Sequence, residues 1–264
     1  MTDRWTTQEK LLLAVICGVV FLDTLDLSLV QVALPSIGSA LGLGEGPLQW
    51  IVSAFVLGYG GFLLLGGRCA DVLGRRRVLL AGLVALAVAS VLGTVASDVT
   101  LLIATRFIKG VSAAFTAPAA LSILTTSFAE GQRRNRALGL YAAGAAAGFT
   151  FGLVVGGLLA ELSWRYTFAA VVPAALALFV AARRVVHPDT QTSRTRGQLD
   201  LGGAVLVTGA MLVFVRTIVV ANSAERLDVQ GWVREREAEP GESSCGQDRR
   251  EIRARPDAEQ HETG

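Results

Sequence analysis

Four ionisable residues interrupt two otherwise apolar runs of this chain. Asp23 and Asp26 stand three residues apart in the first run, and Arg106 and Lys109 stand three residues apart in the fourth. A separation of three places the two members of each pair on one face of a helix. Ionisable groups inside an apolar helix are costly, and they often mark paths for ions or protons. We expect the acids and the bases to pair across a polar interior.

Asp26 is the residue predicted to carry protons. It lies deep in its run, where a medium of low dielectric constant disfavours the ionised form of a carboxyl group. Asp23 lies nearer the start of the same run and is expected to matter less for proton exchange. For Asp23 and Arg106 a second interpretation stays open, in which they pair for structural reasons or extend toward an interface. Lys109 is expected to reach an interface or the rim of a cavity, and Gln31 follows further along the first run.

The runs that hold these residues are long enough to span a membrane. The chain is 52% apolar and 17% charged, and its mean hydropathy of +0.51 sets it apart from ordinary soluble domains. A span needs about 20 mostly apolar residues, and the backbone inside lipid must satisfy its hydrogen bonds within a helix. The segments that qualify lie at about 11–34, 48–66, 78–97, 101–123, 138–160, 166–183 and 202–222. The sequence therefore predicts an all-α polytopic membrane protein, with a six-helix bundle and one further transmembrane helix.

The Lys and Arg residues between the spans predict the orientation. One set of loops holds nearly all of them: Arg4, Lys10, Arg68, Arg75, Arg76, Arg77, Arg133, Arg134, Arg136, Arg183, Arg184, Arg194 and Arg196. The alternate loops, near 35–47, 98–100 and 161–165, hold only Arg165. Positive charge gathers on the cytoplasmic side of a membrane protein, so we expect a cytoplasmic N-terminus. Anchoring explains these charges, and no nucleic-acid partner is expected.

Nothing in the sequence favours an enzyme, a metal site or a cofactor. The cysteines, Cys17, Cys69 and Cys245, are far apart and lack the spacing of metal ligands. Both histidines, His187 and His261, lie in polar segments. No pairing of a nucleophile with a base and no phosphate-binding loop is evident, so we expect a protein without enzymatic activity.

The segment 223–264 differs in composition from the rest of the chain. Of its 42 residues, 18 are charged, so it cannot bury enough apolar surface to offset its ordering entropy, and it is predicted to be disordered. It is interpreted either as a regulatory tail or as the result of a truncation or alteration near 222–232, which we favour. The predicted organisation is a six-helix bundle at 1–186, a loop and seventh span at 187–222, and this tail.

Two further patterns concern the contacts between helices. In the fifth span, glycines recur every four residues at Gly148, Gly152 and Gly156, with Gly157 beside the last, and this spacing lets two helix backbones approach closely. Between the second and third spans, residues 67–77 are predicted to form a short cationic loop on the cytoplasmic side. The residues of this loop that are predicted to be functional are Gly67, Asp71, Gly74, Arg75 and Arg76.

These motifs together resemble the N-terminal half of a transporter of the major facilitator superfamily, and most closely the fourteen-helix drug:proton antiporters. The loop 67–77 resembles the superfamily's hairpin between helices 2 and 3. Residues 26–35 and 106–110 resemble the first- and fourth-helix motifs of the group, and the glycines resemble its fifth-helix motif. Three residues of this chain depart from the usual pattern of the family: Gln31 lies where Asn is usual, Lys109 where Gln is usual, and Leu153 where Pro is usual.

The resemblance implies a transporter in the plasma or inner membrane that exchanges protons for drugs or other small molecules. Six-helix halves of such proteins rock about a central site, with the first and fourth spans facing the cavity. Asp71 and Arg75 are then expected to help close the cytoplasmic side. A C-terminal half or a second copy is expected as partner. The alternative is a membrane interaction or regulatory protein built on half of the transporter fold.

Overall fold

A computed structural model describes residues 5–187, 209–210, 213 and 217 of the chain. Every regular element in this part is a helix: α1 (Thr7–Leu41), α2 (Glu45–Leu73), α3 (Arg75–Val95), α4 (Val99–Ser127), α5 (Gln132–Leu162), α6 (Arg165–Ala169) and α7 (Val171–Val185). Six segments of the described part are long and apolar enough to cross a membrane, because α6 and α7 together make the sixth, Arg165–Val185. The prediction of an all-α polytopic membrane protein with six helices in its bundle is confirmed.

Most of the predicted seventh span and the whole predicted tail at 223–264 lie outside the described residues. The chain divides into a unit that ends at Arg216 and a second unit, Thr217–Gly264, of which only Thr217 is described. All seven helices belong to the first unit.

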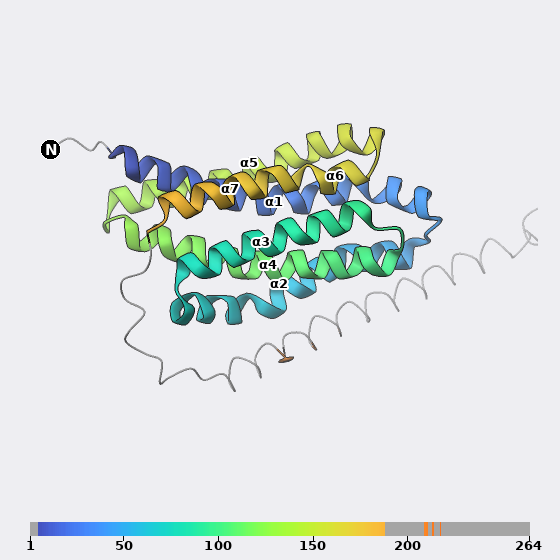
Figure 1. Cartoon of the computed structure of the whole chain (residues 1–264), viewed down its shortest axis with the longest axis horizontal. Coiled ribbons are helices and arrows are strands. Elements are labelled where there is room, and N and C mark those ends of the chain that lie inside the picture. Colours follow the sequence, from blue (N-terminus) through green and yellow to red (C-terminus); the bar gives the residue numbers. More distant parts are fainter. Residues whose placement is uncertain (1–4, 188–208, 211–212, 214–216, 218–264) are drawn as a thin grey trace, which may run out of the picture. The chain divides into compact units, whose positions relative to one another are not determined.

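The bundle is built from two sets of helices with equivalent contacts (Figure 1). Helix α1 packs most extensively on α5, and α4 packs most extensively on α2. Helix α3 lies against α4, and α7 lies against α1 in the same way, while α3 and α7 also contact each other. The helices α1–α3 and the helices α4–α7 therefore form two equivalent groups. The contact of α1 with α5 corresponds to that of α4 with α2, and the contact of α4 with α3 corresponds to that of α1 with α7. Internal repeats of this kind are typical of secondary transporters.

The helices extend beyond the predicted spans, and the predicted loop at 67–77 is mostly helical. Helix α2 continues to Leu73 and α3 begins at Arg75, so that Gly74 alone makes the turn, with a φ of 96°. Such a positive φ favours glycine, which has no Cβ. The prediction bounded each span by its apolar run, whereas a helix that leaves the membrane can continue with polar side chains.

The sixth span has a break that the apolar pattern did not predict. Helix α6 ends at Ala169 and α7 begins at Val171, two residues before Pro173. Proline has no N–H to donate to the carbonyl of residue 169, so the regular hydrogen bonding of one continuous helix is lost at this position.

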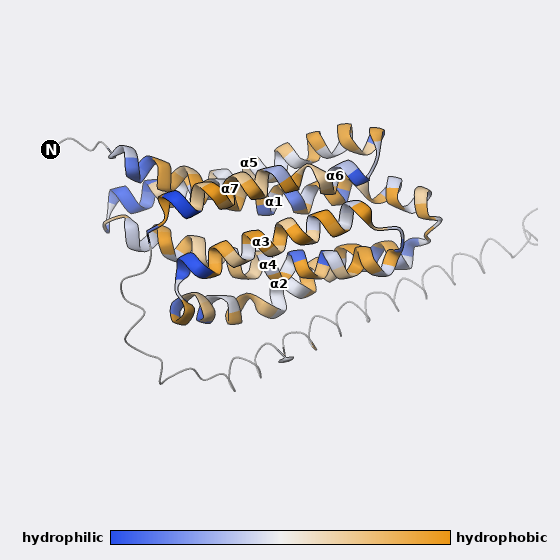
Figure 2. Ribbon diagram, viewed as in Figure 1, coloured by the Kyte–Doolittle hydropathy of each residue, from blue (hydrophilic) through white to orange (hydrophobic). Residues whose placement is uncertain are grey.

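Five helix ends lie together at one end of the bundle, and polar contacts join them in pairs. The start of α1 contacts the start of α5 through a Glu9–Arg133 ion pair of 3.0 Å. The start of α3 contacts the end of α4, where Arg75 Nη1 donates to Thr126 Oγ1 at 2.9 Å. It also contacts the end of α7, where Arg76 Nη2 donates to the Arg183 carbonyl at 2.6 Å. This end, at the left of Figures 1 and 2, is the more hydrophilic one.

Apolar clusters lie on both sides of the middle of the bundle. The cluster toward the basic end includes Leu79, Leu83 and Phe128, and the one toward the opposite end includes Ile37 and Ile51. On α1 the first cluster ends at Val19 and the second begins at Val30. Asp23 and Asp26 lie between them, so both carboxylates are held near the middle of the helix and away from water.

Candidate functional site

A cluster of three charged side chains lies between α1 and α4. Asp26 Oδ2 accepts from Arg106 Nη1 at 3.0 Å, and Asp26 Oδ1 accepts from Lys109 Nζ at 2.5 Å. The side chains of Asp26 and Arg106 are each 1% exposed, and that of Lys109 is 0% exposed. The predicted pairing of acids on the first span with bases on the fourth is confirmed for these three residues.

The sequence led us to expect Lys109 at an interface or at the rim of a cavity, and this prediction is wrong. Its side chain is buried and contacts Asp26. It follows Arg106 by three residues, which directs both cations from one face of α4 toward the same carboxylate. A buried charge is tolerated when it is paired. The ion pair with Asp26 therefore accounts for the burial of an amine that would otherwise extend to water.

Two aromatic rings cover the cations. The ring of Phe55, on α2, lies 4.7 Å from the Arg106 guanidinium carbon, and the ring of Phe168, on α6, lies 4.6 Å from Lys109 Nζ. A cation over the face of an aromatic ring is attracted by its quadrupole, and more strongly when water is excluded. The rings thus close the cluster from α2 and α6, and four helices contribute to holding the three charges.

Asp23 has a different environment one turn earlier on α1. Its side chain is buried, with 8% exposed, and Oδ2 accepts from Thr116 Oγ1 at 2.8 Å. Its other oxygen, Oδ1, is buried without a hydrogen-bond partner among the described residues. No cation in this part of the chain forms an ion pair with it. The sequence analysis did not single out Thr116, although it lies seven residues after Lys109, on the same face of α4.

Tyr59 on α2 and Tyr141 on α5 lie within electrostatic range of Asp23. Both tyrosines line a cavity of about 570 Å³ between α2, α4 and α5. The same cavity is bounded by Gly67, Arg68 and Asp71 near the basic end of α2. The predicted hairpin residue Asp71 is exposed at this cavity, and Gln31 is exposed elsewhere, without a hydrogen bond to any described residue.

The glycine face of α5 packs against α1. Gly148, Gly152 and Gly156 are buried there. A Cβ at Gly152 would lie 2.8 Å from the Leu25 carbonyl oxygen, and one at Gly156 would lie 3.1 Å from Leu29 Cα. At Gly157 the nearest atom would be 4.0 Å away. The first three glycines thus allow a close approach of two backbones, which fixes the position of the helix that carries Asp23 and Asp26.

The equivalent contact between α2 and α4 also depends on glycine. A Cβ at Gly58 would lie 2.5 Å from the Phe107 carbonyl oxygen, and one at Gly110 would collide with the backbone of Phe55. The sequence analysis did not identify this second close approach, because these glycines do not recur at a regular spacing of four within one span. It fixes α4, which carries Arg106 and Lys109, as the α5 glycines fix α1.

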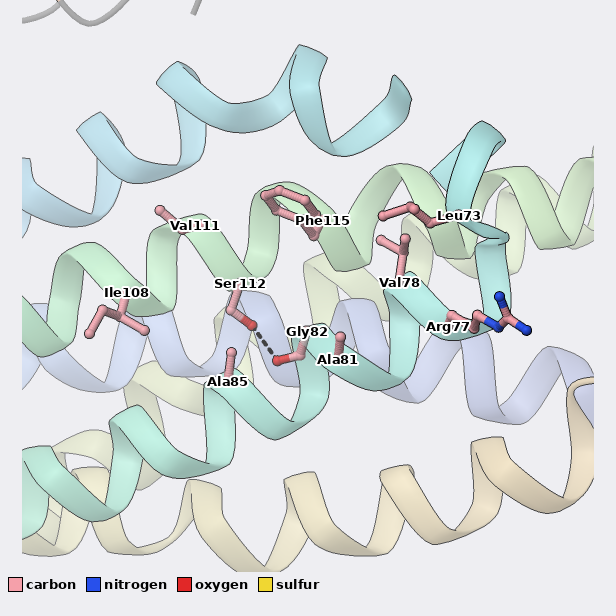
Figure 3. Close-up of a pocket in the computed structure, with 10 residues that line it drawn as sticks. All are labelled: Leu73, Arg77, Val78, Ala81, Gly82, Ala85, Ile108, Val111, Ser112 and Phe115. Carbon is pink, nitrogen blue, oxygen red and sulfur yellow. Dashed lines mark hydrogen bonds between the residues drawn. The ribbon is translucent and has the colours of Figure 1, made fainter. Parts of the chain in front are cut away.

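A second cavity, of about 450 Å³, lies along α3 and α4 near the end of α2 (Figure 3). Its walls are apolar apart from Arg77 and Ser112, and Ser112 Oγ donates to the Gly82 carbonyl at 2.6 Å. The hydroxyl is therefore already satisfied. This cavity shares no residue with the charged cluster, and among the described residues no group of His, Cys, Asp and Glu could hold a metal ion.

Comparisons with known proteins agree with this architecture. The family model of the Major Facilitator Superfamily matches residues 16–233. The uncharacterized MFS-type transporter EfpA of Mycobacterium tuberculosis is 38% identical over 206 residues, which cover 77% of this chain and 38% of EfpA. The cephamycin export protein CmcT of Amycolatopsis lactamdurans is 40% identical over 86% of this chain and 46% of its own length. The puromycin resistance protein pur8 of Streptomyces alboniger is 40% identical over 80% and 42%.

Solved structures show the same fold at low sequence identity. The proton:xylose symporter XylE is 17% identical, with a TM-score of 0.61, over 81% of this chain and 52% of XylE. A peptide transporter POT is 16% identical, with a TM-score of 0.63, over 79% of this chain and 46% of that transporter. The chain spans less than half the length of the curated relatives described above. Its match to the family model over residues 16–233 shows that the chain belongs to the major facilitator superfamily.

Proposed function

We propose that this chain forms the N-terminal bundle of a proton-coupled exporter of antibiotics or other small molecules. The names of relatives at 31–40% identity support export: a cephamycin export protein, a puromycin resistance protein and a tetracenomycin C resistance and export protein. The proposal takes the class of substrate from these names, and the chain's own residues supply the argument for proton coupling.

The observation that carries the proposal is the buried group of four ionisable residues between α1 and α4. Holding charges at this depth is expensive, and nothing in the packing of a purely structural bundle requires them. Asp23, Asp26, Arg106 and Lys109 sum to zero charge when all four are ionised. Adding one proton raises that sum by one. Such a group can therefore couple the movement of a proton to the movement of the helices that hold it.

Transport also needs a second bundle, against which this one can move. The chain matches 38–46% of the length of its relatives, which supports a partner equivalent to their C-terminal part, or a second copy of the chain. Gln31 and the open cavity between α2, α4 and α5 are exposed in this bundle. In the proposed assembly they face the partner across the substrate path.

The basic end of the bundle is proposed to face the cytoplasm of the cell membrane. Within the described residues it carries Lys10, Arg68, Arg75, Arg76, Arg77, Arg133, Arg134, Arg136, Arg183 and Arg184. At the opposite end Arg165 is held by the Ala96 carbonyl at 3.2 Å and by the ring of Trp164. The excess of positive charge at one end supports this orientation.

Cysteine labelling tests the orientation. In a chain without its native cysteines, Glu130→Cys at the basic end is expected to react with a membrane-impermeant maleimide only after the cells are opened. Glu45→Cys, at the opposite end, is the matched control and should react in intact cells. Both side chains are exposed, so both should be reachable. The reverse pattern would overturn the orientation.

Transport itself is tested with the chain joined to the C-terminal part of a relative and placed in inside-out vesicles. Addition of a substrate such as puromycin or ethidium is expected to dissipate an imposed proton gradient, because export and proton entry are coupled. Vesicles with Arg106→Ala should lose most of this response, since Asp26 then loses one of its two cations. If the joined protein moves no substrate and no protons, yet the chain captures a membrane partner, the interaction role would replace the transport role.

A further inference from the structure

The two buried carboxylates of α1 have opposite surroundings, although they are only three residues apart. Asp26 contacts two cations, Arg106 and Lys109, at 3.0 and 2.5 Å. Asp23 contacts no cation in the described part of the chain, and its only hydrogen bond comes from Thr116. The same chemical group thus lies once in a site that stabilises its ionised form and once in a site that gives its charge no ion-pair partner among the described residues.

Asp26 is held in its charged form by its partners. A proton on Asp26 would leave two buried cations without a counterion, and an unpaired buried charge costs several kcal/mol. Both of its oxygens already accept a hydrogen bond from a cation, and a proton on either oxygen would weaken both ion pairs by removing the negative charge. The cluster therefore opposes the proton exchange that the sequence analysis assigned to Asp26.

Asp23 has the features of a group that exchanges protons. Its Oδ1 is buried and unpaired, so an ionised carboxylate there lacks both a counterion and a complete set of donors. A proton on Oδ1 removes the charge that lacks an ion-pair partner and leaves the bond from Thr116 to Oδ2 in place. We infer that Asp23, and not Asp26, is the residue that binds and releases the proton, and its part in transport rests on the function proposed above.

A cavity near the basic end supplies the groups for a proton route to Asp23. The cavity of about 570 Å³ is lined by Tyr59 and Tyr141, and by Arg68 and Asp71 at the basic end of α2. Tyr59 and Asp71 are twelve residues apart, which corresponds to about 18 Å along the helix. Tyrosine hydroxyls can both donate and accept hydrogen bonds. A hydronium ion in this cavity can give its proton to a tyrosine hydroxyl while that hydroxyl releases its own proton to Asp23 Oδ1, once the two side chains come within hydrogen-bond distance; one O–H bond then forms for each that breaks, and water remains.

Protonation of Asp23 changes the net charge of the buried groups around it. The titratable and charged side chains that face this region are Asp26 and Cys17 on α1, Tyr59 on α2, Arg106 and Lys109 on α4 and Tyr141 on α5. Helices α3 and α7 carry charged residues only at their basic ends. Protonation of Asp23 shifts the sum for the four buried charges from zero to +1, while Asp26 stays ionised between its cations.

Infrared difference spectroscopy of the 264-residue chain in lipid nanodiscs tests this inference without requiring transport. Spectra recorded over a series of pH steps report the carbonyl stretch of protonated carboxyl groups. Asp23→Asn is expected to abolish the band of the buried carboxyl group, and Glu161→Gln, which removes an exposed carboxylate, is expected to retain it. A buried-carboxyl band that persists in Asp23→Asn, or its absence from the unmodified chain, would overturn the inference.

A second variant keeps the test decisive if Asp23→Asn does not fold. Asp23→Glu retains a carboxyl group but moves it by one methylene, so the frequency and midpoint of the band should both change. A band identical to that of the unmodified chain would show that another residue produces it. The result is separate from the vesicle experiment: a band from Asp23 without coupled transport would refute the proposed function alone, and coupled transport without such a band would refute the assignment of Asp23.

Discussion

Replacing Asp26 with Asn is expected to destabilise the bundle by about 3–5 kcal/mol. The substitution preserves the size of the side chain but leaves Arg106 and Lys109 buried without a counterion, and breaking a buried ion pair from one side has a cost of this order. The two cations also lie on one face of α4, so their mutual repulsion is then unopposed. The free energy of unfolding, measured by titration with a denaturing detergent in mixed micelles, reports the loss.

The matched variant is Lys109→Met, which removes one of the two cations from the same cluster. Asp26 and Arg106 then remain as a one-to-one pair, and Met fills a similar volume, so the expected change is within about 1 kcal/mol. The contact of Lys109 with Phe168 is lost, but a methionine can still pack on the ring. Equal destabilisation by the two variants would mean that the carboxylate of Asp26 is not what balances the cluster.

The contrast between Asp23 and Asp26 also shows where sequence reasoning reaches its limit. The spacing of three in each pair predicted that acids on one helix would meet bases on another, and the Asp26 ion pairs agree with it. Which acid receives the cations depends on how far α1 slides along α4, and the sequence of either helix alone does not fix this. The antiparallel register places Arg106 and Lys109 opposite Asp26 and Thr116 opposite Asp23. Only the packed structure shows that one carboxylate has two cations and the other has none.

The helices themselves were easier to predict than their ends. Long apolar runs must be helical in lipid, so the six described spans followed from hydropathy. Their ends did not, because Leu41, Leu73 and Ser127 lie in or beside polar segments where hydropathy falls but the helix continues. The turn at Gly74 is one residue long, whereas the charged stretch around it suggested a loop. The charge pattern also predicted that the basic residues would gather at one end of the bundle, and in the described part they do; the side of the membrane that this end faces is the prediction that the cysteine labelling tests.

Substitution of Gly152 by Leu is expected to prevent α1 and α5 from packing, and to lower the free energy of unfolding by about 3 kcal/mol or more. A Cβ at this position would lie 2.8 Å from the Leu25 carbonyl oxygen and would also collide with the hydroxyl of Ser28. Neither backbone can move without shifting a whole helix, so the cost is expected at or above the upper end of that for overpacking. The displaced helix is the one that carries Asp23 and Asp26, so the ion pairs to α4 should be lost as well.

Gly139→Leu is the control on the same helix. No atom lies within 4 Å of a Cβ built at Gly139, and leucine has the higher helix propensity, so this variant should fold with unchanged or slightly raised stability. Thermal unfolding of both variants in detergent, with the monodisperse yield from gel filtration, separates the two effects. If Gly152→Leu matched Gly139→Leu in yield and stability, the backbones of α1 and α5 would not be in close contact. The glycines would then be explained by a lipid-facing or partner-facing surface, and the charged cluster would have to be held in place by α2 and α4 alone.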